Sequence, residues 1–295
     1  MTEETLCETE SRIVTGERLA ASPVVQVIEP SAGWIGINGR ELWLYRELLY
    51  FLTWRDVKIR YKQTILGAAW AILQPFMTMV VFALFFGRLA GLGHKTGGIP
   101  YPIYVYAGLL PWTFFATAIG SSGNSLVGSA SLITKVYFPR LVIPLAAVGA
   151  GLVDLAVSFT ALLALMIYYR TPLSWQLLWV PLFLAGTVLV ATGIGSLLSA
   201  LTVSFRDFQY VVPFMIQLWL FMTPIIYPPS LVPEKWRWLL FLNPMAGLIE
   251  GFRAAFLARP LDWPPIGISL LVSIVLFLAG AAYFQQVENR FADII

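Results

Sequence analysis

The chain has few of the side chains on which most catalytic and metal sites depend. Its 295 residues include one cysteine, Cys7, and one histidine, His94. A single cysteine excludes a disulfide framework and a cysteine metal site within one chain. The lone histidine has no partners at ligand spacing, and no serine, histidine and aspartate arrangement suits nucleophilic catalysis. We therefore expect no enzymatic activity, metal or cofactor in this chain.

A nucleotide-binding loop is missing too. The segment GLGHKTGG at residues 91–98 is rich in glycine, but it lacks the G-x-x-x-x-G-K-[ST] spacing and follows no expected strand. We expect a turn there. The net charge of +3 gives no indication of nucleic acid, and we expect no nucleic-acid partner.

Charged residues are scarce, at 12% of the chain against roughly 25% in an ordinary soluble domain. Charge-free segments cover residues 63–87, 96–134, 171–205, 208–233 and 263–287, and segment 141–169 is interrupted only by Asp154. Each can hold a transmembrane helix of about 20 residues. We predict an all-α integral membrane protein with spans near residues 66–87, 103–119, 141–168, 177–200, 210–222 and 266–283.

The basic residues indicate the orientation of these spans, because they favour the cytoplasmic side. A basic cluster, Arg55, Lys58, Arg60 and Lys62, precedes the first span. The short loops on the same side carry Lys135, Arg140 and Arg206, and the short outer loops carry Arg88, Lys95 and Arg170. The long fifth connection weakens this tally, since it adds Lys235, Arg237, Arg253 and Arg259 to the outer side. The basic cluster decides for a cytoplasmic location of both termini.

Four regions follow from this topology. Residues 1–38 are acidic and lack the apolar core of a signal peptide, so we expect a mobile cytoplasmic tail. Residues 39–64 form an interfacial helix, 65–284 the six-helix membrane domain, and 285–295 a cytoplasmic tail.

The interfacial helix is inferred from spacing. Residues 54–62 nearly alternate between apolar and charged, which alone would indicate a strand. A helix accounts for a longer stretch, because it aligns Tyr50, Trp54, Val57, Tyr61 and Ile65 on one face, with Asp56 four residues before Arg60.

Two connections stand out. Segment 121–135 is rich in small polar residues and is followed by VYFPRLVIP, which predicts a short cytoplasmic helix and a stiff re-entry. Between the fifth and sixth spans, the apolar run 238–249 is too short to span and is broken at Asn243 and Pro244. Two re-entrant helices within about 228–262 fit best, and broken backbone at membrane depth must be sheltered by protein or line a path.

Two features inside the spans have open interpretations. Asp154 can bind a cation or a substrate hydroxyl, or it can be neutralised by a hydroxyl or an arginine of a neighbouring helix. Aromatic residues can stack on sugars along a pathway or pack against lipid. The aromatic residues inside proposed spans are Trp70, Phe76, Phe82, Phe86, Trp112, Phe115, Phe214, Trp219 and Phe221.

Three motifs resemble those of a known family. They are R-D-x-K-x-R-Y-K-Q-T-x-L-G-x-x-W at 55–70 with Gln74-Pro75, K-V-Y-F-P-R at 135–140, and Asn243-Pro244. Over residues 40 to 290 the chain resembles the membrane subunit of ABC type-2 exporters of lipid-linked polysaccharides, which include O-antigen, capsule and teichoic-acid exporters. The acidic N-terminal extension is unusual for a minimal member.

The resemblance implies a homodimer in the bacterial inner membrane, with two copies of a separate ATPase subunit that bind ATP and Mg²⁺. It implies that the ATPase contacts a coupling segment with Ser129, Leu132, Lys135, Tyr137, Phe138 and Arg140. A lipid-linked glycan, with undecaprenyl diphosphate as the expected carrier, would enter at Arg55, Lys58, Arg60, Lys62, Leu66 and Gly67. The outer gate would contain Tyr227, Trp236, Trp238, Asn243 and Pro244.

Three alternatives remain. The same scaffold can export a drug or a simple lipid, which the aromatic content favours less than a glycan. An ion-coupled carrier or channel would use Asp154 and need no ATPase. A membrane-bound transferase would need His94 or Asp154 as a catalytic group, and the scarcity of polar groups argues against it.

Overall fold

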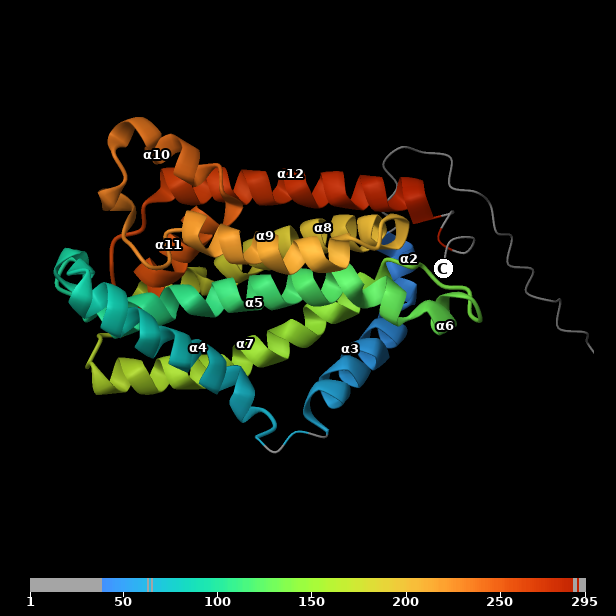
Figure 1. Cartoon of the computed structure of the whole chain (residues 1–295), viewed down its shortest axis with the longest axis horizontal. Helices are drawn as coiled ribbons and strands as arrows, with labels where there is room; N and C mark the ends of the chain where they lie inside the picture. The colour runs from blue at the N-terminus through green and yellow to red at the C-terminus, as the bar shows by residue number, and fades with distance from the viewer. Residues whose placement is uncertain (1–38, 63, 65, 289–290, 292–295) are drawn as a thin grey trace, which may run out of the picture. The chain divides into compact units, whose positions relative to one another are not determined.

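The computed structural model describes residues 39–62, 64, 66–288 and 291, and every regular element in these ranges is helical (Figure 1). The predicted tail 1–38, with Cys7, and most of the C-terminal tail lie outside the described residues. The α-helices are α2 (Gly39–Leu44), α3 (Arg46–Tyr61), α4 (Ala69–Phe82), α5 (Tyr101–Gly128), α6 (Ala130–Ile133), α7 (Val142–Tyr168), α8 (Val180–Ser204), α9 (Phe208–Met222), α10 (Glu234–Phe241), α11 (Pro244–Phe256) and α12 (Trp263–Glu288). Shorter elements are the π-helix η1 (Ala83–Leu89) and the 3₁₀ turns η2 (Leu92–Lys95), η3 (Trp175–Trp179) and η4 (Pro229–Leu231).

Five of the described helical segments are long and apolar enough to cross a membrane: Ala69–Leu89, Tyr101–Gly128, Val142–Tyr168, Trp175–Ser204 and Trp263–Glu288. The predicted fifth span, α9, has only 15 residues. At 1.5 Å per residue it is about 22 Å long, shorter than the ~30 Å hydrocarbon layer. The all-helical membrane class is therefore supported with five candidate spans, and the count of six stays a prediction.

α5 is the central helix of the bundle. It packs against α4, α7, α8 and α11, and nearly every residue from Tyr101 to Trp112 is buried. The predicted short helix within 121–135 is present as α6, but it has only four residues because α5 continues to Gly128. Small residues explain the continuation: a Cβ on Gly195 of α8 would lie 2.5 Å from the Ser122 hydroxyl, so the two helices approach closely here.

α8 and α12 approach each other closely at two glycines. A Cβ on Gly280 would lie 2.0 Å from the carbonyl oxygen of Gly193, and a Cβ on Gly193 would lie 2.5 Å from the Phe277 backbone. Any side chain at these two positions would push the helices apart, so the glycines permit the close packing.

α3 follows the predicted interfacial segment, and part of the predicted stripe, Val57 and Tyr61, faces the bundle. Its buried residues are Leu52 and Val57, while Tyr50 and Trp54 of the predicted stripe are exposed. The face is set by α7, where the missing side chain of Gly149 leaves room for Thr53. Ile65 lies outside the described residues.

The predicted pair of short helices before the last span is present as α10 and α11, separated at Asn243-Pro244. The two helices differ in burial. None of the eight residues of α10 is buried, whereas twelve of the thirteen residues of α11 are. We call the end of the bundle with α10, η1 and η2 the α10 end, and the opposite end with α6 the α6 end (Figure 1).

Candidate functional site

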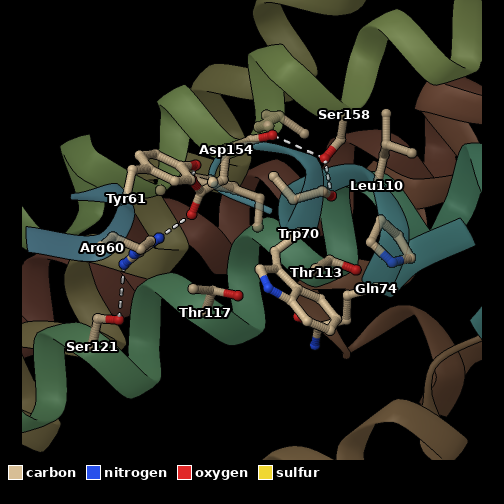
Figure 2. Close-up of a pocket in the computed structure, with 16 residues that line it drawn as sticks. Arg60, Tyr61, Trp70, Gln74, Leu110, Thr113, Thr117, Ser121, Asp154 and Ser158 are labelled. Atoms are coloured by element: carbon tan, nitrogen blue, oxygen red, sulfur yellow. Dashed lines mark hydrogen bonds and ion pairs between the residues drawn. The ribbon is translucent and has the colours of Figure 1, made fainter. Parts of the chain in front are cut away.

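Asp154 is the centre of a cluster that joins three helices. Its carboxylate on α7 accepts hydrogen bonds from the Arg60 guanidinium and the Tyr61 hydroxyl, both on α3 (Figure 2). Arg60 also lies 3.5 Å from the hydroxyl of Ser121 on α5. Of the alternatives for Asp154, the structure supports neutralisation by an arginine. The predicted pairing of Arg60 with Asp56 is replaced by this contact.

The cluster holds α3 on the bundle. The side chains of Arg60 and Asp154 are 30% and 20% exposed, so water screens their attraction only in part. Burial, followed by the hydrogen bond to Asp154 and the carboxylate charge, raises the pKa of Tyr61 well above its ordinary value of 10.0. Tyr61 therefore stays protonated near neutral pH and remains a hydrogen-bond donor.

Arg60, Tyr61 and Asp154 border a cavity of about 390 Å³ between the α3–α4 connection, α5 and α7. Its wall combines one half-exposed indole with hydroxyl and amide groups, which come from Trp70, Gln74, Thr113, Thr117, Ser121 and Ser158 (Figure 2). Such a wall offers a flat apolar face beside neutral donors and acceptors, as polar ligands with ring structures require. Arg60 also borders a second cavity of about 480 Å³, which is lined by Arg55, Asp56 and Ser129.

The turn between α3 and α4 closes the first cavity and depends on Gly67. This residue has φ of +49°, a left-handed conformation that glycine adopts without steric cost. Leu66 beside it is exposed. The predicted entrance residues Leu66 and Gly67 thus form a sharp turn at the rim of the cavity.

The four basic residues of the cluster differ in whether their charge is free to bind an anion. Arg55 is paired with Asp56 at 2.9 Å, and Arg60 is paired with Asp154. Lys58 lies over the Trp54 ring at 5.5 Å and, like Lys62, is exposed. Among the described residues, neither lysine has a salt-bridge partner. The charge that an anion can reach at this site is therefore carried by Lys58 and Lys62.

At the α10 end, Asn243 fixes the start of α11. Its side-chain oxygen accepts from the Met245 amide at 3.1 Å and from the Trp219 indole at 3.0 Å, and its amide donates to the Thr223 hydroxyl at 2.8 Å. Of the other predicted gate residues, Pro244 is buried, Tyr227 is partly buried, and Trp236 and Trp238 are exposed on α10.

Arg253 is the residue that sequence reasoning missed. It is fully buried, and its guanidinium contacts the ring of Tyr104 and pairs with Glu250 at 2.6 Å. It also donates to the carbonyls of Tyr104, Pro224 and Ile225. The available signal was the Glu250 and Arg253 spacing of three residues within an apolar helix, which a count of loop charges treats as surface.

Comparison with known proteins identifies the family. Residues 47–257 match the family model described as ABC-2 type transporter. The chain belongs to this family. It is 32% identical over 260 residues to a Myxococcus xanthus protein named O-antigen export system permease protein RfbA, covering 87% of this chain and 98% of that protein.

Two further relatives have similar coverage. A Klebsiella pneumoniae protein of the same name is 33% identical over 253 residues, which are 84% of this chain and 95% of the relative. The polysialic acid transport protein KpsM of Escherichia coli is 24% identical over 255 residues, which are 80% of this chain and 91% of the relative. The ABC-2 match extends from α3 to the end of α11, so the Arg60–Asp154 cluster and Arg253 both lie within the family region.

The proposed coupling segment of this ABC-2 protein has an exposed and a buried part. Lys135 and Tyr137 are exposed, and Leu132 is partly buried. Ser129 and Phe138 are buried, and Arg140 donates to the backbone carbonyl of Glu288 at the end of α12. Lys135 and Tyr137 are therefore accessible to a partner protein, whereas Ser129 and Phe138 pack inside the bundle.

The aromatic residues proposed for a glycan path also differ in exposure. Trp70, Phe214 and Phe221 are exposed, and Phe76, Phe86 and Trp219 are partly buried. Phe82, Trp112 and Phe115 are buried in the core, where Trp112, Phe115 and Trp219 pack with ring centroids 5.1 to 6.4 Å apart. The buried rings of Phe82, Trp112 and Phe115 stabilise the bundle, so we leave these three residues out of the path proposed below.

Proposed function

We propose that the chain is the membrane subunit of an ATP-driven exporter that moves a lipid-linked cell-surface polysaccharide, such as an O-antigen, out of the cytoplasm. The observation that carries this proposal is the match over 98% of a relative named as an O-antigen export permease. The relation to a polysialic acid transport protein supports a polysaccharide cargo over a drug or a simple lipid.

The working transporter would contain two copies of this chain and two copies of a separate ATPase subunit that binds ATP and Mg²⁺. Large apolar surfaces of the chain need covering: only 17% of the Ala69–Leu89 span is buried, and Val212 is the one buried residue of α9. A second copy and lipid would cover them. α9 would act as the short fifth span, with α10 and α11 as the outer gate and both termini in the cytoplasm.

The entrance would lie at the turn between α3 and α4. Lys58 and Lys62 would attract the diphosphate of the lipid carrier, since both are exposed and free of salt bridges within the described residues. The adjoining 390 Å³ cavity is lined by the indole of Trp70 and by threonine and serine hydroxyls, and it would receive the first sugar.

Arg60 takes a different role from the one first expected. Its bonds to Asp154 connect α3 to α7, so ATPase closure against the coupling segment would move α3 and α7 together. Asp154 is neutralised by Arg60 and Tyr61, which argues against its use as an ion-coupling site.

The proposal is tested by expressing the tagged chain in its host and asking which ATPase copurifies with it. The reconstituted complex should hydrolyse ATP faster when a lipid-linked glycan is added, and deletion of the chain should remove the surface polysaccharide. The charge reversal Lys58→Glu with Lys62→Glu should reduce export without loss of insertion, with Lys95→Glu as the outer-loop control. A chain that binds no ATPase, or a deletion strain with unchanged surface polysaccharide, contradicts the proposal.

A further inference from the structure

A cavity at the α10 end has a composition that the entrance and the gate helices do not explain. It holds about 320 Å³ between η4, α10, α11, the 257–262 connection and the start of α12. Two arginines and two carboxylates border it, together with a hydroxyl and an aromatic ring: Arg237, Arg259, Glu250, Asp262, Ser230 and Phe241.

The charges around this cavity are not paired with one another. Within the part of the chain that the structure describes, Arg237, Arg259 and Asp262 form no salt bridge. Opposite charges that line one small space would normally pair unless something holds them apart or fills the space between them. Here Arg237 lies on α10 and Glu250 on α11, while Arg259 and Asp262 share the 257–262 connection and still form no salt bridge with each other.

Arg237 carries a second sign of a missing partner. Its Nε is buried without a hydrogen bond, and its one hydrogen bond to a described residue is a 3.4 Å contact to the Val232 carbonyl. A buried donor that is left unsatisfied costs about 1–3 kcal/mol, so native proteins rarely keep one without an acceptor nearby.

The floor of the cavity is rigid. Glu250 is held by the buried Arg253 at 2.6 Å, and Arg253 is fixed to α5 and to the 224–225 backbone. Only the Oε1 atom of Glu250 takes part in these contacts. The second carboxylate oxygen therefore has a fixed orientation before any ligand arrives, which lowers the entropic cost of binding.

We propose that this cavity is a carbohydrate subsite that binds one or two sugar rings of the glycan on the outer side of the membrane. The inference rests on the proposed polysaccharide cargo. Sugar hydroxyls both donate and accept hydrogen bonds: they donate to Glu250 and Asp262 and accept from Arg237 and Arg259. Phe241 supplies an apolar face.

Size and charge select this ligand class over others. The volume of about 320 Å³ is near the lower end of small-molecule sites, roughly 300–1,000 Å³, and suits a short saccharide rather than a lipid chain. An inorganic anion would meet the two arginines but also Glu250 and Asp262, whose charges repel it.

The test uses the permease and its ATPase partner together, in lipid nanodiscs. The probe is the oligosaccharide released by mild acid from the host's own surface polysaccharide, and binding is followed by saturation-transfer NMR. Arg237→Gln and Asp262→Asn should each weaken binding about tenfold, the loss of one charge-assisted hydrogen bond. The control Lys95→Gln, at an exposed position that does not border the cavity, should bind as the unmodified complex does. Asp262 is exposed, so its variant should fold normally.

Two results would overturn the subsite. One is saccharide binding that neither variant weakens, which would locate the sugar elsewhere in the complex. The other is competition by inorganic phosphate with no saccharide signal, which would indicate an anion site. In parallel, each variant is expressed in the deletion strain. If the unmodified chain restores surface polysaccharide but the binding prediction fails, the subsite is wrong and the export function stands. If the unmodified chain restores none, the export function itself fails.

Discussion

Replacing Arg253 by methionine tests how much the buried guanidinium holds the outer helices together. Met keeps much of the apolar volume but removes every donor. Glu250, the Tyr104 hydroxyl and the carbonyls of Pro224 and Ile225 then lose their partner. Removing one member of a buried ion pair costs about 3–5 kcal/mol, because the other charge stays buried. For a chain of this size that corresponds to a fall in melting temperature of roughly 6–20 °C.

A second substitution separates the charge from the packing. Glu250→Gln alone should cost less, since its side-chain oxygen still accepts from Arg253. Arg253→Met with Glu250→Gln should melt above Arg253→Met alone, because no unpaired carboxylate remains. Melting is followed by fluorescence-detected size exclusion in detergent, with the exposed loop variant Arg206→Met as control. A fall of less than 2 °C for Arg253→Met, or no recovery in the double variant, would refute the argument.

Three further predictions concern other contacts. Gly280→Ala should lower the melting temperature strongly, because its Cβ would lie 2.0 Å from the Gly193 carbonyl, whereas Gly267→Ala in the same helix, with no atom within 4 Å, should be neutral. Asp154→Asn should increase hydrogen exchange in α3, and the swap of Arg60→Asp with Asp154→Arg should reduce it again, as mass spectrometry can measure. Tyr61 keeps its proton in the folded chain above pH 10.0, where the unfolded chain releases it, so its contribution is present below that pH and falls above it. Melting curves from pH 6 to 11 should therefore show an alkaline loss that Tyr61→Phe lacks.

Each of these predictions has a clear negative result. Equal melting temperatures for the two glycine variants would mean that α8 and α12 can separate at no cost. Unchanged exchange in Asp154→Asn would mean that other contacts hold α3. An identical alkaline loss in Tyr61→Phe would assign it to other groups, such as the lysines.

Features that depend on local composition, such as the positions of spans and helix breaks, could be predicted from the sequence. Spans are encoded by the absence of charge, so 141–168 was predicted almost to the residue of α7, Val142–Tyr168. The break at Asn243-Pro244 was also readable, because asparagine and proline favour a helix start and Asn243 does cap α11. Composition failed at residues 121–128, where small polar residues indicated a separate short helix but belong to α5 and let α8 approach it.

The candidate sites depend on contacts between distant residues, which one sequence does not encode locally. Asp154 meets Arg60 across 94 positions, and Arg253 meets Tyr104 across 149. The apolar stripe on α3 did not reveal which of its members face the bundle, because a contact with a distant residue, that of Thr53 with Gly149, helps to set the orientation of the helix. Arg253 was counted as an outer loop charge for the same reason.

The bond between Arg60 and Asp154 has a consequence for the order of events during synthesis. Arg60 leaves the ribosome well before Asp154, which lies 94 positions later. Until α7 has been inserted, Arg60 is an unpaired cation and would add to the positive charge that holds the N-terminal segment at its proposed cytoplasmic location. Once α7 is in place, the same residue becomes half of a neutral pair and α3 can settle against the bundle. One arginine would thus serve first as a topology signal for the translocon and later as an internal contact, and α3 would be among the last parts of the chain to dock.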